Sequence, residues 1–113
     1  MTPFNPLKGR AASQRAFAAL WTLADGWYRQ DRLAKAMADA TGVGRSWAEE
    51  LLRWPARAGQ IPRKLVVIRN REAAIVYLSR ERLRRAFPDF DPDAINAPAL
   101  ELTPLKNQGW GFD

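Results

Sequence analysis

The chain contains no cysteine and no histidine. Disulfides are therefore excluded, and so are structural zinc sites built from cysteine or histidine. Catalysis by a Cys-His or Ser-His-Asp arrangement within one chain is excluded as well. What remains is carboxylate or metal-carboxylate chemistry, but Asp89, Asp91 and Asp93 lack the glycine and closing glutamate of a calcium loop. We expect no enzymatic activity, no metal and no cofactor.

Long apolar runs are also lacking. The longest, such as residues 65–68, are far shorter than the roughly 20 residues of a membrane span. The first residues lack the basic start and apolar centre of a signal peptide. We therefore expect a soluble, cytoplasmic protein with no membrane partner.

Charge is plentiful but unevenly distributed along the 113 residues. Residues 1–87 hold 17 basic and 7 acidic side chains, a balance of +10, whereas residues 88–113 hold one lysine and 5 acidic side chains, a balance of −4. A basic body with an acidic tail is typical of nucleic-acid-binding proteins. The composition predicts an arm over residues 1–10, one domain over residues 11–87 and an acidic, proline-containing tail over residues 88–113.

Apolar periodicity predicts three helices in the first half of the chain. The first begins near Ala11, and Gly26 is placed to end it. The second covers about residues 31–40. The third begins near Arg45, and Pro55 is expected to end or kink it. The apolar faces of the first two helices are formed by Phe17, Leu20, Trp21 and Ala24, and by Leu33, Ala34, Met37 and Ala38.

The period then changes from helical to alternating. Two β-branched runs, residues 64–69 and 73–78, are separated by polar residues 70–72 and predict a β-hairpin. Ser79 is a good N-cap for a short helix over residues 80–87. Earlier in the chain, Trp27 and Tyr28 predict a very short strand. The tail after Pro88 either docks on the body or is flexible, and its apolar residues are Ile95, Leu100, Leu102 and Leu105.

The order helix, helix, turn, helix, hairpin resembles a winged helix-turn-helix domain over roughly residues 12–79. The helix-turn-helix pattern has a small residue four before its turn glycine, here Ala38 and Gly42, and an apolar residue after it, here Val43. Ala48 and Leu51 match the apolar positions six and nine residues past the glycine, whereas Gly44 departs from the usual polar residue. The segment 58–61 resembles the Gly-x-Ile end of the recognition helix in many winged regulators.

The resemblance implies a mainly α fold with a small β-hairpin, in which a three-helix core carries a wing. The protein would be of the small bacterial or mobile-element regulator type. The third helix would enter the major groove by its N-terminus. Arg45 would contact guanine or a phosphate, Ser46 a phosphate, and Arg53 the DNA backbone.

The same helix also carries acidic residues. Glu49 or Glu50 can accept a hydrogen bond from cytosine N4, although paired carboxylates are repelled by phosphates. Alternatively, Arg45 and Arg53 pair with these glutamates at helical spacing and form a solvated surface. For Trp47 and Trp54 we expect core packing rather than stacking on bases.

The hairpin is the second candidate contact with DNA. Arg63 and Lys64 open it, while Arg69 and Arg71 flank its tip. The resemblance implies a wing that lies along the backbone or in the minor groove, where four positive charges would neutralise phosphates. The alternative is a charged edge that prevents strand aggregation.

Two further segments leave alternatives open. The helix over residues 80–87 is dense in arginine and either follows phosphates or binds the acidic segment 89–93 of the same or a partner chain. Trp110 and Phe112 near the C-terminus either dock on their own domain or recruit a protein partner. The arm or the tail can also supply the contact of a homodimer. The basic helix contains Arg80, Arg82, Arg84 and Arg85.

The sequence therefore predicts a double-stranded DNA-binding protein that regulates transcription or replication. The alternative is a winged-helix protein-interaction module, for example a phage or plasmid inhibitor that docks on a host protein complex. Glu49 and Glu50 on the expected reading face favour this alternative.

Overall fold

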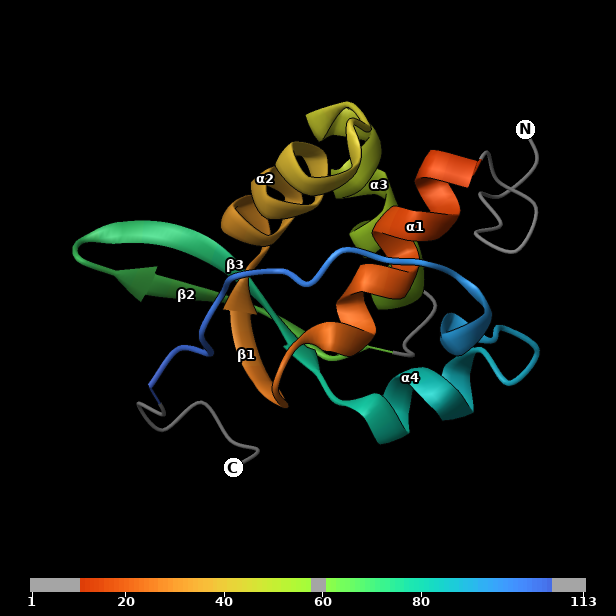
Figure 1. The fold of residues 1–113 in the computed structure, drawn as a ribbon. Helices are drawn as coiled ribbons and strands as arrows, with labels where there is room; N and C mark the ends of the chain where they lie inside the picture. The colour runs from red at the N-terminus through yellow and green to blue at the C-terminus, as the bar shows by residue number, and fades with distance from the viewer. Residues whose placement is uncertain (1–10, 58–60, 107–113) are drawn as a thin grey trace.

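The computed structural model describes the backbone of residues 11–57 and 61–106, and the side chains of 11–53 and 61–106. In these ranges the fold is α+β, with four α-helices and one three-stranded antiparallel sheet (Figure 1). The elements are α1 (Ala11–Ala19), the 3-10 helix η2 (Leu20–Thr22), β1 (Gly26–Arg29), α2 (Gln30–Thr41), α3 (Arg45–Arg57), β2 (Arg63–Ile68), β3 (Arg71–Leu78), α4 (Arg80–Ala86) and the 3-10 helix η3 (Pro92–Ala94).

The sheet has the strand order β1-β3-β2, so the strand predicted at Trp27 and Tyr28 is confirmed. Both outer strands pair with β3, and Tyr28 and Arg63 both lie opposite Val76. The hairpin of β2 and β3 projects beyond the helices, at the left of Figure 1. Tyr28, Val76 and Leu78 belong to the main core cluster, so one face of the sheet packs toward the helices.

The hairpin is confirmed, but its turn is shorter than expected. Ile68 pairs with Arg71, so only Arg69 and Asn70 connect the strands, with φ angles of 51° and 63°. Two consecutive residues at positive φ match the right-handed twist of the flanking strands, which makes a two-residue connection favourable. The prediction that residues 70–72 form the connection is therefore wrong, because Arg71 and Glu72 already belong to β3.

The turn between α2 and α3 has the conformation that its glycine permits. Gly42 has φ 81° and donates its N–H to Ala38 O at 2.9 Å, closing the helix in the left-handed region. Ala48 and Leu51 are buried, and Val43 packs against the core. These predictions of the helix-turn-helix pattern are confirmed, whereas Ala38 itself is half-buried rather than buried.

The end predicted for the first helix is wrong, and the third helix does not end at Pro55. Helix α1 ends at Ala19 and tightens into η2, because Thr22 Oγ1 donates to Ala19 O and Leu23 N to Leu20 O. Gly26 instead opens β1, and Ala24, expected on the apolar face, is exposed. Helix α3 continues to Arg57, past Pro55. A proline there removes one N–H donor near the C-terminal end, yet its own φ is compatible with a helix.

The core is centred on Phe17, which is fully buried. The rings of Phe87 and Phe90 each lie 4.9 Å from its ring, and that of Trp21 lies 5.2 Å away, all edge-on. Because Phe87 ends α4 and Phe90 follows it, these contacts fix α4 and the start of the tail on α1.

The tail docks on the body at least as far as Leu105, which decides between the two alternatives for that part of it. Leu100 is buried, and its N–H donates to Thr22 Oγ1 at 3.1 Å. Leu105 N–H donates to Trp27 O at 2.8 Å. In Figure 1 this blue segment crosses α1 and then runs beside β1. We call residues 100–105 the C-terminal strap.

Candidate nucleic-acid interface

The exposed face of α3 carries charges that are already paired. Ala48, Leu51 and Leu52 are buried, so Ser46, Glu50 and Arg53 lie on the opposite side of the helix. The ion pairs join Arg45 Nε to Glu49 Oε1 at 3.9 Å, Arg53 Nη2 to Glu49 Oε2 at 3.7 Å and Arg53 Nη1 to Glu50 Oε1 at 3.4 Å. The interpretation that these arginines pair with the glutamates is confirmed, and the charges of the four side chains cancel.

The tip of the hairpin differs from α3 because its positive charges have no ion-pair partner among the described residues. Arg69 lies in the turn, Arg71 begins β3, and both are exposed. Within residues 11–53 and 61–106, neither side chain has an ion pair or a hydrogen-bond partner. Arg69 and Arg71 flank Asn70 and so place two positive charges at the end of the hairpin, which projects at the left of Figure 1. We call Arg69 and Arg71 the wing tip.

The other two predicted basic residues lie at the base of the hairpin. Arg63 Nε donates to Gln30 Oε1 at 2.9 Å, which ties β2 to the first residue of α2. Lys64 Nζ lies 5.5 Å from the centre of the Trp27 ring. Six residues of extended strand span about 20 Å, so the four charges form two separate pairs. Arg63 and Lys64 thus open the hairpin and Arg69 and Arg71 flank its tip, as the sequence predicted, while contact of either pair with DNA stays a prediction.

Trp47 was expected in the core, and this prediction is wrong. Its side chain is 41% exposed, and its indole N–H donates to Ser13 Oγ. One position along a helix rotates a side chain by about 100°, so Trp47 lies beside the buried face that contains Ala48 rather than on it. The hydrogen bond to Ser13 shows that this side of α3 faces α1. The side chain of Trp54 lies outside the described residues, as do the arm over residues 1–10 and the aromatic pair Trp110 and Phe112.

Three of the four arginines of α4 have contacts within the body. Arg80 Nε donates to Trp21 O at 3.2 Å, Arg85 pairs with Glu81 at 2.9 Å, and the guanidinium of Arg82 lies 5.7 Å from the Tyr77 ring. Across the described ranges no ion pair joins α4 to the acidic segment 89–93. Contact with phosphates, or with the acidic segment of a partner chain, stays a prediction for this helix.

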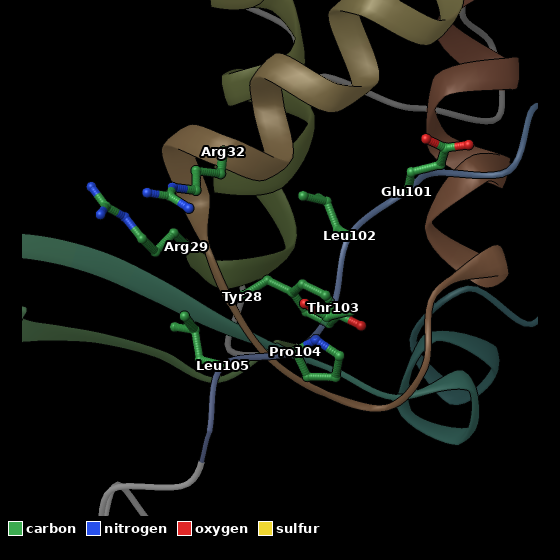
Figure 2. Close-up of a pocket in the computed structure, with 8 residues that line it drawn as sticks. All are labelled: Tyr28, Arg29, Arg32, Glu101, Leu102, Thr103, Pro104 and Leu105. Carbon is green, nitrogen blue, oxygen red and sulfur yellow. The ribbon is translucent and has the colours of Figure 1, made fainter.

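The structure also contains a pocket that the sequence did not suggest. Its volume is about 270 Å³, and it lies between the end of β1, the start of α2 and the C-terminal strap. Figure 2 shows Arg29 and Arg32 on one side and Glu101 on the other. Because the lining residues come from two distant parts of the chain, only tertiary contact brings them together. They are Tyr28, Arg29, Arg32, Glu101, Leu102, Thr103, Pro104 and Leu105.

Two ionisable groups beside this pocket have shifted pKa values. Burial, together with the charge of Asp25, raises the pKa of Tyr28, whose hydroxyl donates to Ala24 O. For Asp31, burial alone would raise the pKa, but hydrogen bonds from Arg29 and from Arg32 N–H outweigh it and lower the pKa. The Asp31 carboxylate forms an ion pair with Arg29, in which Oδ2 lies 3.0 Å from Nη2.

The described residues contain neither a membrane-spanning helix nor a cluster of potential metal ligands. No helix among them is long and apolar enough to cross a membrane. No group of three or more potential metal-ligating side chains occurs in the same part of the chain. Comparison with known proteins likewise finds no matching family, no similar curated protein and no similar solved structure.

Proposed function

We propose that this chain is a winged helix-turn-helix protein that binds double-stranded DNA and regulates transcription or replication. The order of its helices and strands, the sheet order β1-β3-β2 and the left-handed Gly42 between α2 and α3 support this assignment. In this fold the helix after the turn is placed to enter the major groove, and the hairpin is placed beside it.

The wing tip is the observation that carries the proposal. Arg69 and Arg71 are exposed and have no counter-charge among the described residues, on a chain whose first 87 residues carry a balance of +10. Free guanidinium groups on a projecting hairpin suit contact with phosphates, because neutralising a phosphate releases bound counterions. We therefore assign the electrostatic part of DNA binding to the wing tip.

Helix α3 has a different role in the proposal. Its described arginines are held by Glu49 and Glu50, so the helix contributes little net attraction to phosphates. Exposed Ser46 near its N-terminus and Arg53 between its two glutamates are arranged to contact base edges or individual phosphates once the wing has placed the helix. Binding by this protein should thus be driven by the wing and refined by α3.

The test is fluorescence anisotropy of a labelled random-sequence duplex, titrated with the full chain at about 50 and about 200 mM salt. We expect micromolar affinity at the lower salt concentration and a steep loss at the higher one. If no binding is detected at low salt, the proposal is wrong.

Single-residue variants test whether the wing tip is the part of the protein that contacts DNA. Arg69→Ala and Arg71→Ala should each weaken binding and reduce the slope of log affinity against log salt by about 1. Lys106→Ala is the matched control, since it removes one exposed positive charge next to Leu105, which is bonded to β1 rather than to the hairpin turn. An equal loss in all three variants would indicate a response to net charge alone and would contradict the assignment to the wing tip.

A second candidate function is a protein-interaction module on the same fold, such as a phage or plasmid inhibitor of a host complex. The pairing of Arg45 and Arg53 with the glutamates favours it, because a neutral, hydrogen-bonding helix face suits a protein surface better than phosphates. The two functions differ in the DNA affinity that they predict. A protein-interaction module need not bind DNA, and binding to its protein partner need not change when Arg69 and Arg71 are replaced.

A further inference from the structure

The two edges of the sheet differ in whether another described segment bonds to them. At the β1 edge, the C-terminal strap covers the strand, and Leu105 N–H donates to Trp27 O at 2.8 Å. At the other edge, β2 pairs with β3 and with no other strand of the described chain. An uncovered edge presents a row of unpaired N–H and C=O groups, which are the groups that bind an added strand.

The backbone direction of this open edge follows from the hairpin. Tyr77 N–H donates to Pro62 O at 2.9 Å, so Pro62 directs its carbonyl toward β3. Hydrogen-bonding direction alternates along a strand, so Leu65 and Val67 direct their N–H and C=O groups away from β3. Arg63 has the same direction, so the backbone groups available to a partner belong to Arg63, Leu65 and Val67.

The side chains at the same positions are unusually exposed. Leu65 is 60% exposed and Val67 is 69% exposed, and both lie on the same face of β2. Charge or proline usually protects a free edge from association, but the centre of this strand has neither. Open backbone groups and exposed apolar side chains thus coincide on one short stretch, residues 65–67.

The charges around this stretch decide what chemistry fits it. Arg63 and Lys64 precede the apolar centre, and the wing tip follows it. In an antiparallel pair of two β2 strands centred on Val66, Arg63 of each copy would face Arg69 of the other. Like charges directly opposite one another are destabilising, so a second copy of this chain paired in this register is a poor occupant. A strand with acidic residues on both sides of an apolar centre is complementary.

We propose that β2 adds an extended strand of a partner protein, whose alternating apolar residues pack on Leu65 and Val67 and whose flanking Asp or Glu residues meet Arg63, Lys64 and the wing tip. This surface does not depend on DNA binding by α3. It shares the wing tip with the proposed DNA contact, so an acidic partner strand and DNA would compete for this protein.

The test uses a displayed library of nine-residue peptides with five randomised central positions and either acidic or basic flanks, selected on the full chain. We expect enrichment of acidic-flanked peptides with alternating apolar centres. A synthetic enriched peptide is then titrated by fluorescence anisotropy, beside a peptide with the same acidic flanks and a Ser-Gly centre. The proposal is overturned if neither flank class is enriched, if basic flanks are enriched equally, or if the Ser-Gly peptide binds as tightly.

Two variants separate the contribution of the β2 backbone to peptide binding from that of its side chains. Val67→Pro removes an outward N–H that β3 does not use, and the double variant Leu65→Thr, Val67→Thr places β-branched residues, which suit a strand, at both positions but removes the apolar contact. Each of these two variants should bind the peptide with an affinity at least tenfold lower than that of the unaltered chain. Trp47→Thr, which removes exposed apolar surface on α3, is the matched control and should leave peptide affinity unchanged.

Retained peptide binding in the threonine double variant would overturn the proposal. So would a concentration-dependent dimer in sedimentation that Val67→Pro abolishes, because the occupant of β2 would then be a second copy of this chain.

Discussion

Gly26 and Pro104 are in contact at the β1 edge of the sheet, so closely that a Cβ atom at position 26 would lie 2.6 Å from Pro104 Cβ. Gly26 also has φ 156°, a backbone conformation that favours glycine. The contact joins the first residue of β1 to the C-terminal strap, which in turn closes the pocket beside Tyr28.

Replacement of this glycine should therefore destabilise the protein. Gly26→Ala should lower the free energy of unfolding by about 1–3 kcal/mol, because the new methyl group meets Pro104 and the backbone is strained. Urea denaturation followed by tryptophan fluorescence measures the change. Gly44→Ala is the control, since a Cβ there meets nothing within 4 Å. Equal stability of both variants would show that the strap does not pack against position 26.

The hydrogen bond between Arg63 and Gln30 should stabilise the base of the hairpin. Gln30 is 6% exposed, so each of Arg63→Ala and Gln30→Ala should cost about 1 kcal/mol in the free energy of unfolding. In a double-mutant cycle the two losses should be less than additive, because they remove the same bond. Arg69→Ala, on the exposed turn of the same hairpin, should change stability by less than about 0.5 kcal/mol. Full additivity would contradict the contact.

The glutamates of α3 should oppose DNA binding if the proposed function is correct. Glu50→Gln removes one carboxylate from the exposed face and leaves Arg53 paired with Glu49 alone, so affinity for random duplex DNA should rise about threefold to fivefold at low salt. Glu101→Gln changes the net charge equally at the C-terminal strap and serves as the control. A loss of affinity in Glu50→Gln would instead indicate that this carboxylate accepts a hydrogen bond from a base.

Asp31 should make stability depend on pH in the acid range. Its pKa in the folded protein lies below the ordinary 3.8, so it favours the folded state above that value, and this contribution is lost as the pH falls through the folded pKa. Because the carboxylate is 47% exposed, Asp31→Asn should cost less than about 1 kcal/mol at about pH 7. Urea denaturation between about pH 2 and pH 7 should show the difference from the unaltered chain shrinking toward acid. A constant difference across that range would contradict the shift.

Much of the local structure follows from short-range pattern in the sequence. The bounds of α2, the start of α3, the hairpin and the N-cap Ser79 were predicted, because apolar periodicity and capping act over a few residues. Ser79 Oγ indeed accepts from Arg82 N–H. Alternatives stayed open where distant contacts decide, as in the tail, where Leu100 N–H donates to Thr22 Oγ1.

The sequence by itself determined the order of elements, the basic body, the glycine turn and the exclusion of thiol and imidazole chemistry. Tertiary structure decided which charges are free and which edge is open. Glu49 and Glu50 neutralise the described arginines of α3, whereas Arg69 and Arg71 on the projecting hairpin have no ion-pair partner among the described residues. In the same part of the chain the strap covers β1, and no strand other than β3 pairs with β2. Local pattern fixes backbone conformation, but the pairing of a charge or an edge depends on residues that only folding brings near.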